Sequence, residues 1–138
     1  LYSKSVTAGA NTNNYGFIGG PMAFDIAAIQ YLYGANMNTA TGNNTYYLPG
    51  TNAAGTYWSC IWDAGGTDTI AYDGTGNAYI DLRAATLDNS PTGGGIPSYV
   101  TSPFIRGGFT IANDVVIEYA RGGSGHDTLV GNNANNGL

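Results

Sequence analysis

The chain has 138 residues, which is the length of a single domain with a modest core. With 43% hydrophobic and only 9% charged residues, it does not have the composition of a disordered protein. The net charge is −5 and only four residues are lysine or arginine, which argues against nucleic acid or an anionic membrane as a partner. No run of residues approaches the roughly 18 apolar positions of a membrane span.

One helix is predicted near the N-terminus, after an irregular segment over residues 1–20. It covers about residues 23–34, because Asp25 lies near its start and Gly34 offers a stop. Its apolar residues recur at spacings of three and four, and few of its side chains are polar. We therefore expect a largely buried packing helix. The apolar positions are Ile26, Ile29, Leu32 and Tyr33.

The rest of the chain has the pattern of a β protein, in which β-branched and aromatic runs alternate with turns. Segment 88–97 carries two prolines and three glycines and is predicted to be a surface loop. Cys60 is the only cysteine, which excludes an internal disulfide, and we expect it to be a buried core thiol. The expected strands are 45–48, 56–61, 69–72, 78–82, 99–105, 109–111, 115–119 and 128–130.

A glycine- and aspartate-containing turn at residues 122–130 matches the nonapeptide G-G-x-G-x-D-x-U-x, where U is a large apolar residue. In this repeat, peptide carbonyls and the carboxylate of Asp127 can face a calcium ion, and a short strand follows. Residues 131–138 form a weaker copy, with Asn136 at the position of Asp127. Segment 63–70, earlier in the chain, has a similar pattern, with paired glycines followed by an aspartate. The sequence therefore predicts a calcium-organised β protein.

Three segments together resemble serralysin-type secreted metalloproteases of the metzincin class. They are the helix with its flanks (21–36), the Trp-Asp-Ala-Gly-Gly-Thr-Asp-Thr segment (62–69), and the Ile-Glu pair with the Gly-Gly-x-Gly-x-Asp turn (117–127). They occur in the order and at the spacing of the C-terminal part of such a protease. The resemblance covers nearly the whole chain.

The resemblance implies a mainly β fold: a calcium-binding parallel β-roll or β-sandwich with one buried α-helix near the N-terminus. Residues 1–36 would be the tail of a metzincin-like catalytic domain. Residues 37–138 would be the calcium-binding β-roll domain, apparently truncated at its C-terminal end. Asn136, a neutral substitute for aspartate, is expected to weaken the last calcium site.

The resemblance also implies calcium ligands, which form three sites. The first site would use the backbone carbonyls of Ala40, Gly42 and Asn44 together with Asp63, Gly65 and Asp68. The second would use Gly66, Asp68, Val116 and Glu118, so that Asp68 bridges the two sites. The third, repeat-type site would use Gly123, Gly125 and Asp127. Oxygen ligands in flexible loops are those that calcium prefers.

A zinc protease of this class needs the motif H-E-x-x-H-x-x-G-x-x-H. The chain has a single histidine, His126, at a variable repeat position where we expect it to be exposed. Tyr2 lies near the position of a family tyrosine that can ligate zinc, which makes it a weak zinc candidate. Zinc would be a cofactor only if an upstream region is a catalytic domain, and this chain alone is not expected to hydrolyse peptides.

The sequence leaves several functions open. One is the calcium-stabilised C-terminal scaffold of a secreted zinc metalloendopeptidase, which would be extracellular and bacterial, with type I secretion. The alternative is a non-enzymatic extracellular structural, adhesive or filament-forming protein that depends on calcium. A carbohydrate-binding module is less supported, because the tyrosines and tryptophans are expected to pack the core. The partners implied are calcium and either an upstream catalytic domain or a second copy of the chain.

Overall fold

The computed structural model describes residues 14–138 and shows a mainly β protein. Helix α1 (Ala23–Tyr33) precedes the strands, as predicted. The strands of the described chain are β1 (Thr45–Tyr47), β2 (Trp58–Ile61), β3 (Thr69–Ala71), β4 (Asn77–Asp81), β5 (Ser98–Ser102), β6 (Gly108–Ile111), β7 (Tyr119–Arg121) and β8 (Thr128–Val130).

The prediction for residues 115–119 is wrong in its position, because the strand begins only at Tyr119. The preceding residues form a turn, in which Asp114 has a positive φ of 64° and the N–H of Val115 donates to the carbonyl of Ala112 at 3.3 Å. Val115 and Ile117 are buried all the same. The apolar residues that suggested a strand therefore fill the core from an irregular segment.

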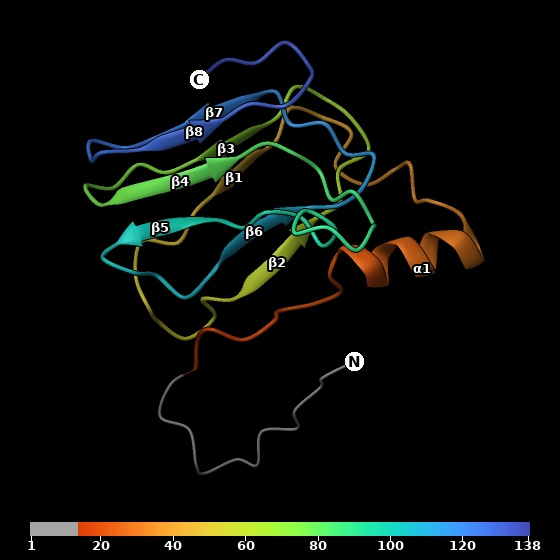
Figure 1. The fold of residues 1–138 in the computed structure, drawn as a ribbon, viewed down its shortest axis with the longest axis horizontal. Coiled ribbons are helices and arrows are strands. Elements are labelled where there is room, and N and C mark those ends of the chain that lie inside the picture. The colour runs from red at the N-terminus through yellow and green to blue at the C-terminus, as the bar shows by residue number, and fades with distance from the viewer. Residues whose placement is uncertain (1–13) are drawn as a thin grey trace.

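The strands form two sheets that share one core. β1, β3 and β7 make a three-stranded parallel sheet, and the other sheet has the order β2-β6-β5-β4-β8. In this second sheet β5 runs antiparallel to both β4 and β6. Figure 1 shows the strands gathered in one body, with α1 projecting at its side. The largest fully buried apolar side chains come from both sheets and the loops between them: Ile70, Ile80, Leu82, Val100, Ile111 and Ile117.

Consecutive strands β3 and β4 lie directly alongside consecutive strands β7 and β8. Thr69 pairs with Tyr119 in one sheet, and Tyr79 pairs with Thr128 in the other, both in parallel register. An excursion over residues 82–118, which carries β5 and β6, separates the two strand pairs in sequence. As a result, the turn that joins β3 to β4 lies against the turn that joins β7 to β8.

Helix α1 has the predicted ends. The Asp25 carboxylate accepts a hydrogen bond from the N–H of Met22 at 3.0 Å, and Gly34 ends the helix with a φ of 81°. The expectation that the helix is buried is wrong for the described chain, in which only Ala23 is buried. Tyr31 is 90% exposed and Leu32 is 68% exposed.

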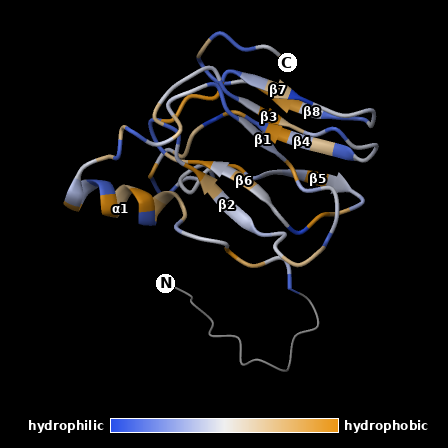
Figure 2. Ribbon diagram, turned by 180° about the vertical axis from the view of Figure 1, so that it is seen from behind, coloured by the Kyte–Doolittle hydropathy of each residue, from blue (hydrophilic) through white to orange (hydrophobic). Residues whose placement is uncertain are grey.

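Ile26, near the start of the helix, packs against the core, whereas the large apolar side chains further along the helix are exposed. Its remaining apolar residues project from the body of the protein, and Figure 2 shows hydrophobic colour along the projecting helix. The spacing of apolar residues along a helix indicates that they share one face, but it does not indicate which part of the protein covers that face. Across residues 14–138, no helix has the length and apolar character needed to cross a membrane.

Cys60 packs against the core as a half-buried residue, and burial raises the pKa of its thiol. Of the aromatic residues expected in the core, Tyr46 and Trp62 pack against it, and Trp58 makes an edge-to-face contact with Tyr99. Tyr47, by contrast, does not pack in the core. It lies on the outer side of the edge strand β1 and is 56% exposed.

Candidate calcium sites

Four polar residues occupy equivalent positions, each just before a strand or bridge residue of the three-stranded sheet. Asn44 precedes β1, Asp68 precedes β3, Glu118 precedes β7, and Asn136 precedes Gly137, which pairs with Tyr119. Because the strands are parallel and in register, these four residues form one column along the end of the sheet. The family resemblance implied calcium sites at Asn44, Asp68 and Glu118, and the fold brings these residues together.

Asp68 is the central residue of this column, and its side chain is fully buried. Its Oδ1 accepts a hydrogen bond from the N–H of Asn44 at 2.7 Å, while its Oδ2 is buried with no partner among the described residues. Oδ1 of Asn44 is also buried without a partner there. Buried oxygens are almost always paired, so two such oxygens at one place fit a cation with oxygen ligands.

The side chain of Asn44, rather than its backbone carbonyl, has the free oxygen. The carbonyl accepts a hydrogen bond from the N–H of Thr69 at 2.9 Å as part of the sheet. The sequence prediction assigned the carbonyl of Asn44 as the ligand. The unpartnered Oδ1 is a second candidate ligand beside the carbonyl, and sequence reasoning did not name it because the register of β1 against β3 was not known.

The first predicted site is framed by segments 38–44 and 63–68, which lie against each other. The N–H of Ala64 donates to the carbonyl of Thr39 at 3.1 Å, and the N–H of Thr67 donates to Oδ1 of Asn43 at 3.0 Å. A side chain on Gly66 would collide with the carbonyl of Gly42. Loop 38–44 therefore lies beside turn 63–68, as the predicted carbonyl ligands Ala40 and Gly42 require.

Asp63 is also buried, but its carboxylate has hydrogen-bond donors. It accepts hydrogen bonds from the hydroxyl of Tyr46 at 2.6 Å and from the N–H of Gly65 at 2.9 Å. Burial, followed by the bond to Asp63, raises the pKa of Tyr46 well above its ordinary value, so Tyr46 holds its proton as a donor. These bonds fix the orientation of the Asp63 carboxylate at the edge of the first site.

The second predicted site has Asp68 and Glu118 in direct contact. The Glu118 carboxylate accepts a hydrogen bond from the N–H of Asp68 at 2.8 Å, although the two residues are 50 positions apart. Counting back along the same register places Val116 opposite Gly66. The pairing of β3 with β7 thus brings Gly66 and Asp68 close to the other two predicted ligands, Val116 and Glu118.

Charge repulsion accompanies this arrangement. Burial raises the pKa of the Asp68 carboxyl, the hydrogen bond from Asn44 opposes that rise, and the carboxylates of Asp63 and Glu118 raise the pKa further. Because like charges close together disfavour ionisation, the cluster favours either protonation or a bound cation.

Asp81 provides a contrast, since it is equally buried but fully paired. The Arg83 guanidinium donates to both of its oxygens at 2.9 and 2.6 Å, and the hydroxyl of Tyr79 donates at 2.9 Å. Although burial acts in the opposite direction, these bonds hold the pKa of Asp81 below its ordinary value. Both carboxylate oxygens of Asp81 are paired, so burial alone does not leave an aspartate with a free oxygen of the kind that Asp68 has.

The third predicted site lies where turns 73–78 and 122–127 stack. Oδ1 of Asp127 accepts a hydrogen bond from the N–H of Ala78 at 2.7 Å, and the N–H of Ser124 donates to the carbonyl of Gly74 at 3.0 Å. Side chains on Gly123 or Gly125 would collide with the carbonyls of Gly74 and Gly76. Glycine is therefore required where the two turns meet.

Sequence reasoning missed turn 73–78 as a structural equivalent of turn 122–127. Asp73 stands where the repeat has its first glycine, and Ala78 stands where it has the aspartate. The spacing of Gly74, Gly76 and the apolar Ile80 was the available signal. Because Ala78 has no carboxylate, Asp127 is the single acidic side chain of these two stacked positions.

Residues 14–138 contain no group of three or more His, Cys, Asp or Glu side chains arranged to hold a metal ion. The predicted sites thus depend on carbonyl and amide oxygens in addition to carboxylates. His126 is exposed, and Tyr2 lies outside the described residues.

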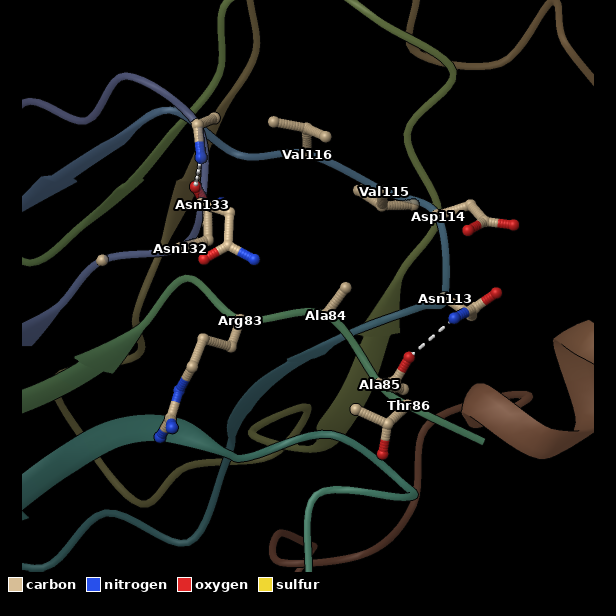
Figure 3. Close-up of a pocket in the computed structure, with 12 residues that line it drawn as sticks. Arg83, Ala84, Ala85, Thr86, Asn113, Asp114, Val115, Val116, Asn132 and Asn133 are labelled. Carbon is tan, nitrogen blue, oxygen red and sulfur yellow. Dashed lines mark hydrogen bonds between the residues drawn. The ribbon is translucent and has the colours of Figure 1, made fainter. Parts of the chain in front are cut away.

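A pocket of about 730 Å³ lies between segments 83–86, 113–116 and 131–134 (Figure 3). Of the predicted ligands, only Val116 lines this pocket.

Comparison with known proteins identifies the family. Residues 23–137 match the family model described as peptidase M10 serralysin C terminal. The chain is 42% identical to serralysin C of Dickeya chrysanthemi over 94% of its length, covering 26% of that protein. It is 40% identical to metallopeptidase AprA of Pseudomonas marginalis over 87% of its length, and 36% identical to serralysin of Proteus mirabilis over 88%. The matched part is 25% of the length of metallopeptidase AprA and 24% of the length of the Proteus mirabilis serralysin.

The chain thus spans about a quarter of the length of the curated relatives that it matches. The match includes both the exposed helix and the stacked turns. The chain belongs to the serralysin C-terminal family of M10 peptidases.

Proposed function

We propose that the chain is the calcium-binding C-terminal portion of a secreted zinc metalloendopeptidase similar to serralysins. The relatives named as serralysins are about four times longer than the matched part, so the peptidase activity would reside in a region outside this match. Within the 138 residues, no zinc-binding H-E-x-x-H motif occurs. The proposed role of the chain is to serve as a calcium-stabilised scaffold outside the cell.

The observation that carries the calcium proposal is the pair of unpartnered oxygens on Asp68 and Asn44. Calcium would bind these oxygens together with Asp63, Gly65 and the carbonyls of loop 38–44. A second calcium would lie between Asp68, Glu118, Gly66 and Val116. Asp68 would bridge both ions, because one of its oxygens is free and the other accepts only a single N–H. A third ion would lie at Asp127 between the carbonyls of the stacked turns.

Helix α1 supports the proposed domain organisation. Its apolar side chains project from the body of the protein, which is the behaviour expected of an element that packs against another part of a longer polypeptide. We propose that residues 1–36 belong to the catalytic domain of the parent protein and residues 37–138 to the calcium-binding β-roll. Zinc, bound in the catalytic domain, would activate the water that attacks a peptide bond.

Calcium would act as part of the fold. Without it, buried Asp68 faces the carboxylates of Asp63 and Glu118, and the short strands have little stability of their own. Calcium is near millimolar outside cells and far scarcer inside them, so folding would be linked to export. This coupling gives a physical reason for a calcium-dependent domain in a secreted protease.

The alternative is a non-enzymatic extracellular protein in which the exposed helix supports self-association. The observation that favours it is the large exposed apolar surface of α1, including Leu32 and Tyr31. A calcium-dependent dimer or filament of the purified chain would support this alternative. Metal-dependent cleavage of casein by the full-length parent, abolished by zinc chelation, would support the protease instead.

The test of the calcium proposal is a titration of the isolated chain with calcium, followed by far-ultraviolet circular dichroism and thermal melting. Magnesium at equal concentrations is the control, because it prefers a smaller and more rigid octahedral site. A cooperative gain of β signal with calcium alone is expected. If calcium changes neither the spectrum nor the melting temperature, the glycine- and aspartate-containing turns are ordinary loops and the proposal fails.

A further inference from the structure

The turn at residues 131–136 repeats the frame of turn 122–127 nine residues later, but its hydrogen bonds are different. Gly131 lies close to Asn136 in the same way that Gly122 lies close to Asp127. Oδ1 of Asn136 accepts a hydrogen bond from the N–H of Asn132 at 2.8 Å. The turn is thus closed by the side chain of Asn136 itself.

The orientation of the Asn136 amide is fixed by its neighbours. Because Oδ1 faces an N–H group, Nδ2 must lie on the opposite side, where the available groups are acceptors. Nδ2 donates to the carbonyl of Glu118 at 3.3 Å and to Oδ1 of Asn132 at 2.9 Å. A carboxylate at this position could not donate either bond.

Asn132 extends this network to two other parts of the chain. Its Nδ2 donates to the carbonyl of Leu82, just after β4, at 3.1 Å and to the carbonyl of Ile117, just before β7, at 2.9 Å. Its Oδ1 also accepts a hydrogen bond from the N–H of Ala134 at 2.9 Å. Figure 3 shows Asn132 in the pocket wall, on the side that faces Val116.

The contrast with Asp68 decides what this turn can bind. Asp68 and Asn44 retain buried oxygens without partners, whereas the amide atoms of Asn132 and Asn136 all have partners. The carbonyl of Glu118 is also used, since it accepts hydrogen bonds from Nδ2 of Asn136 and from the N–H of Gly137 at 3.1 Å. An amide hydrogen therefore occupies the direction from which a cation would approach that carbonyl.

We propose that Asn132 and Asn136 form an amide clasp, which takes the place of a calcium site in the column of Asn44, Asp68 and Glu118. The clasp joins the end of β4, the segment before β7 and the bridge at Gly137 through neutral hydrogen bonds. It stabilises this end of the sheet without a metal ion. The chain thus combines calcium-dependent positions with one position in the same column that is independent of calcium.

The test compares Asn132→Ala and Asn136→Ala with Asn133→Ala and Asn135→Ala. The control asparagines lie in the same turn and are exposed. For each variant, the number of calcium ions bound per chain is measured by native mass spectrometry, and melting temperature is measured across a range of calcium concentrations. The clasp variants should melt about 3–6 °C lower than the controls at every calcium concentration at which the chain is folded. The number of bound ions should be unchanged.

Two results would overturn the clasp. Loss of one bound calcium in Asn136→Ala would show that the turn is a cation site. Melting temperatures equal to those of the control variants would show that the amide network contributes nothing. If the wild-type chain binds no calcium at all, the proposed function fails, while the melting comparison still decides the clasp. Asn132→Asp, which keeps the acceptor and removes both donors, should melt lower than the controls even where Asn132→Ala does not fold.

Discussion

The carbonyl of Gly74 lies against Gly123 so closely that no side chain fits between them. The two residues belong to turns separated by the whole excursion from 82 to 118, and the N–H of Ser124 donates to the same carbonyl at 3.0 Å. This contact holds the stacked turns at the distance set by the pairing of β4 with β8. It makes Gly123 a sensitive test of the stacking.

Gly123→Ala is expected to reduce the free energy of unfolding by about 1–3 kcal/mol, because the new methyl group must push the two turns apart. Gly20→Ala is the matched control, since a methyl group there would meet nothing within 4 Å. Chemical denaturation in saturating calcium measures both variants. Equal stability of the two variants would show that the turns can separate at no cost.

Asp68→Ala should weaken calcium binding more than any other single change, because it removes a carboxylate from two proposed sites. The expected loss is about tenfold in affinity, or about 1.4 kcal/mol, at each of the two sites. Asp73→Ala is the control, since its carboxylate is exposed and, within residues 14–138, pairs with Arg121 at the surface. Isothermal titration calorimetry measures both variants. Asp68→Ala and Asp73→Ala losing affinity equally would refute the bridging role.

Asn44→Ala separates the side-chain oxygen from the backbone carbonyl as a calcium ligand. If Oδ1 binds the ion, the substitution should reduce calcium affinity at the first site by about tenfold. Asn44→Asp should retain or increase the affinity, because it keeps an oxygen at the same place and adds a charge. Calcium titration of the pair measures the difference. Wild-type affinity in Asn44→Ala would return the ligand role to the carbonyl.

The calcium-free protein should become more ordered as pH falls. Burial and neighbouring carboxylates raise the pKa of Asp68 in the folded state. A carboxyl group with a raised folded pKa contributes its full stability below its unfolded pKa and loses it as pH rises through the folded pKa. Lowering pH from neutral toward the ordinary pKa of an aspartate carboxyl, about 4, should therefore increase the β signal in circular dichroism after calcium removal.

Asp68→Asn tests the origin of this pH dependence. Because it removes the charge but keeps the shape, it should show the increased order already at neutral pH. In saturating calcium the direction reverses, since protons compete with the ion for the carboxylate and acid should weaken binding. If the calcium-free wild-type protein and Asp68→Asn follow the same pH curve, Asp68 is not the responsible group.

Local sequence pattern predicted the helix and most of the strands, because alternation and turn residues act over a few positions. It misplaced the strand at 115–119, where Val115 and Ile117 fill the core from an irregular segment. It also failed on the burial of α1, because burial depends on what lies beside a helix. The local sequence pattern thus indicates which side of an element is apolar, but it does not indicate which part of the protein packs against that side.

The candidate calcium sites could likewise be predicted only in part. The glycine and aspartate spacing led to Asp68 and Asp127, and the family resemblance added Glu118; the fold places all three at stacked positions. The free oxygen of Asn44 could not be predicted, and the glycine spacing of turn 73–78 did not reveal its stacking on turn 122–127, because both depend on the register between strands far apart in sequence. Register is a tertiary property, and it is fixed by the shared core rather than by any single segment.

The pairing of β3 with β7 also has a consequence for folding kinetics. Asp68 and Glu118 meet across 50 residues of chain, and strand pairs of such long sequence separation form slowly, because loop closure precedes any gain in contacts. A cation held between these two carboxylates would act at the point where the long loop closes. We therefore expect calcium concentration to control the rate at which β7 and β8 join the earlier strands, so that the chain would fold fastest where calcium is abundant.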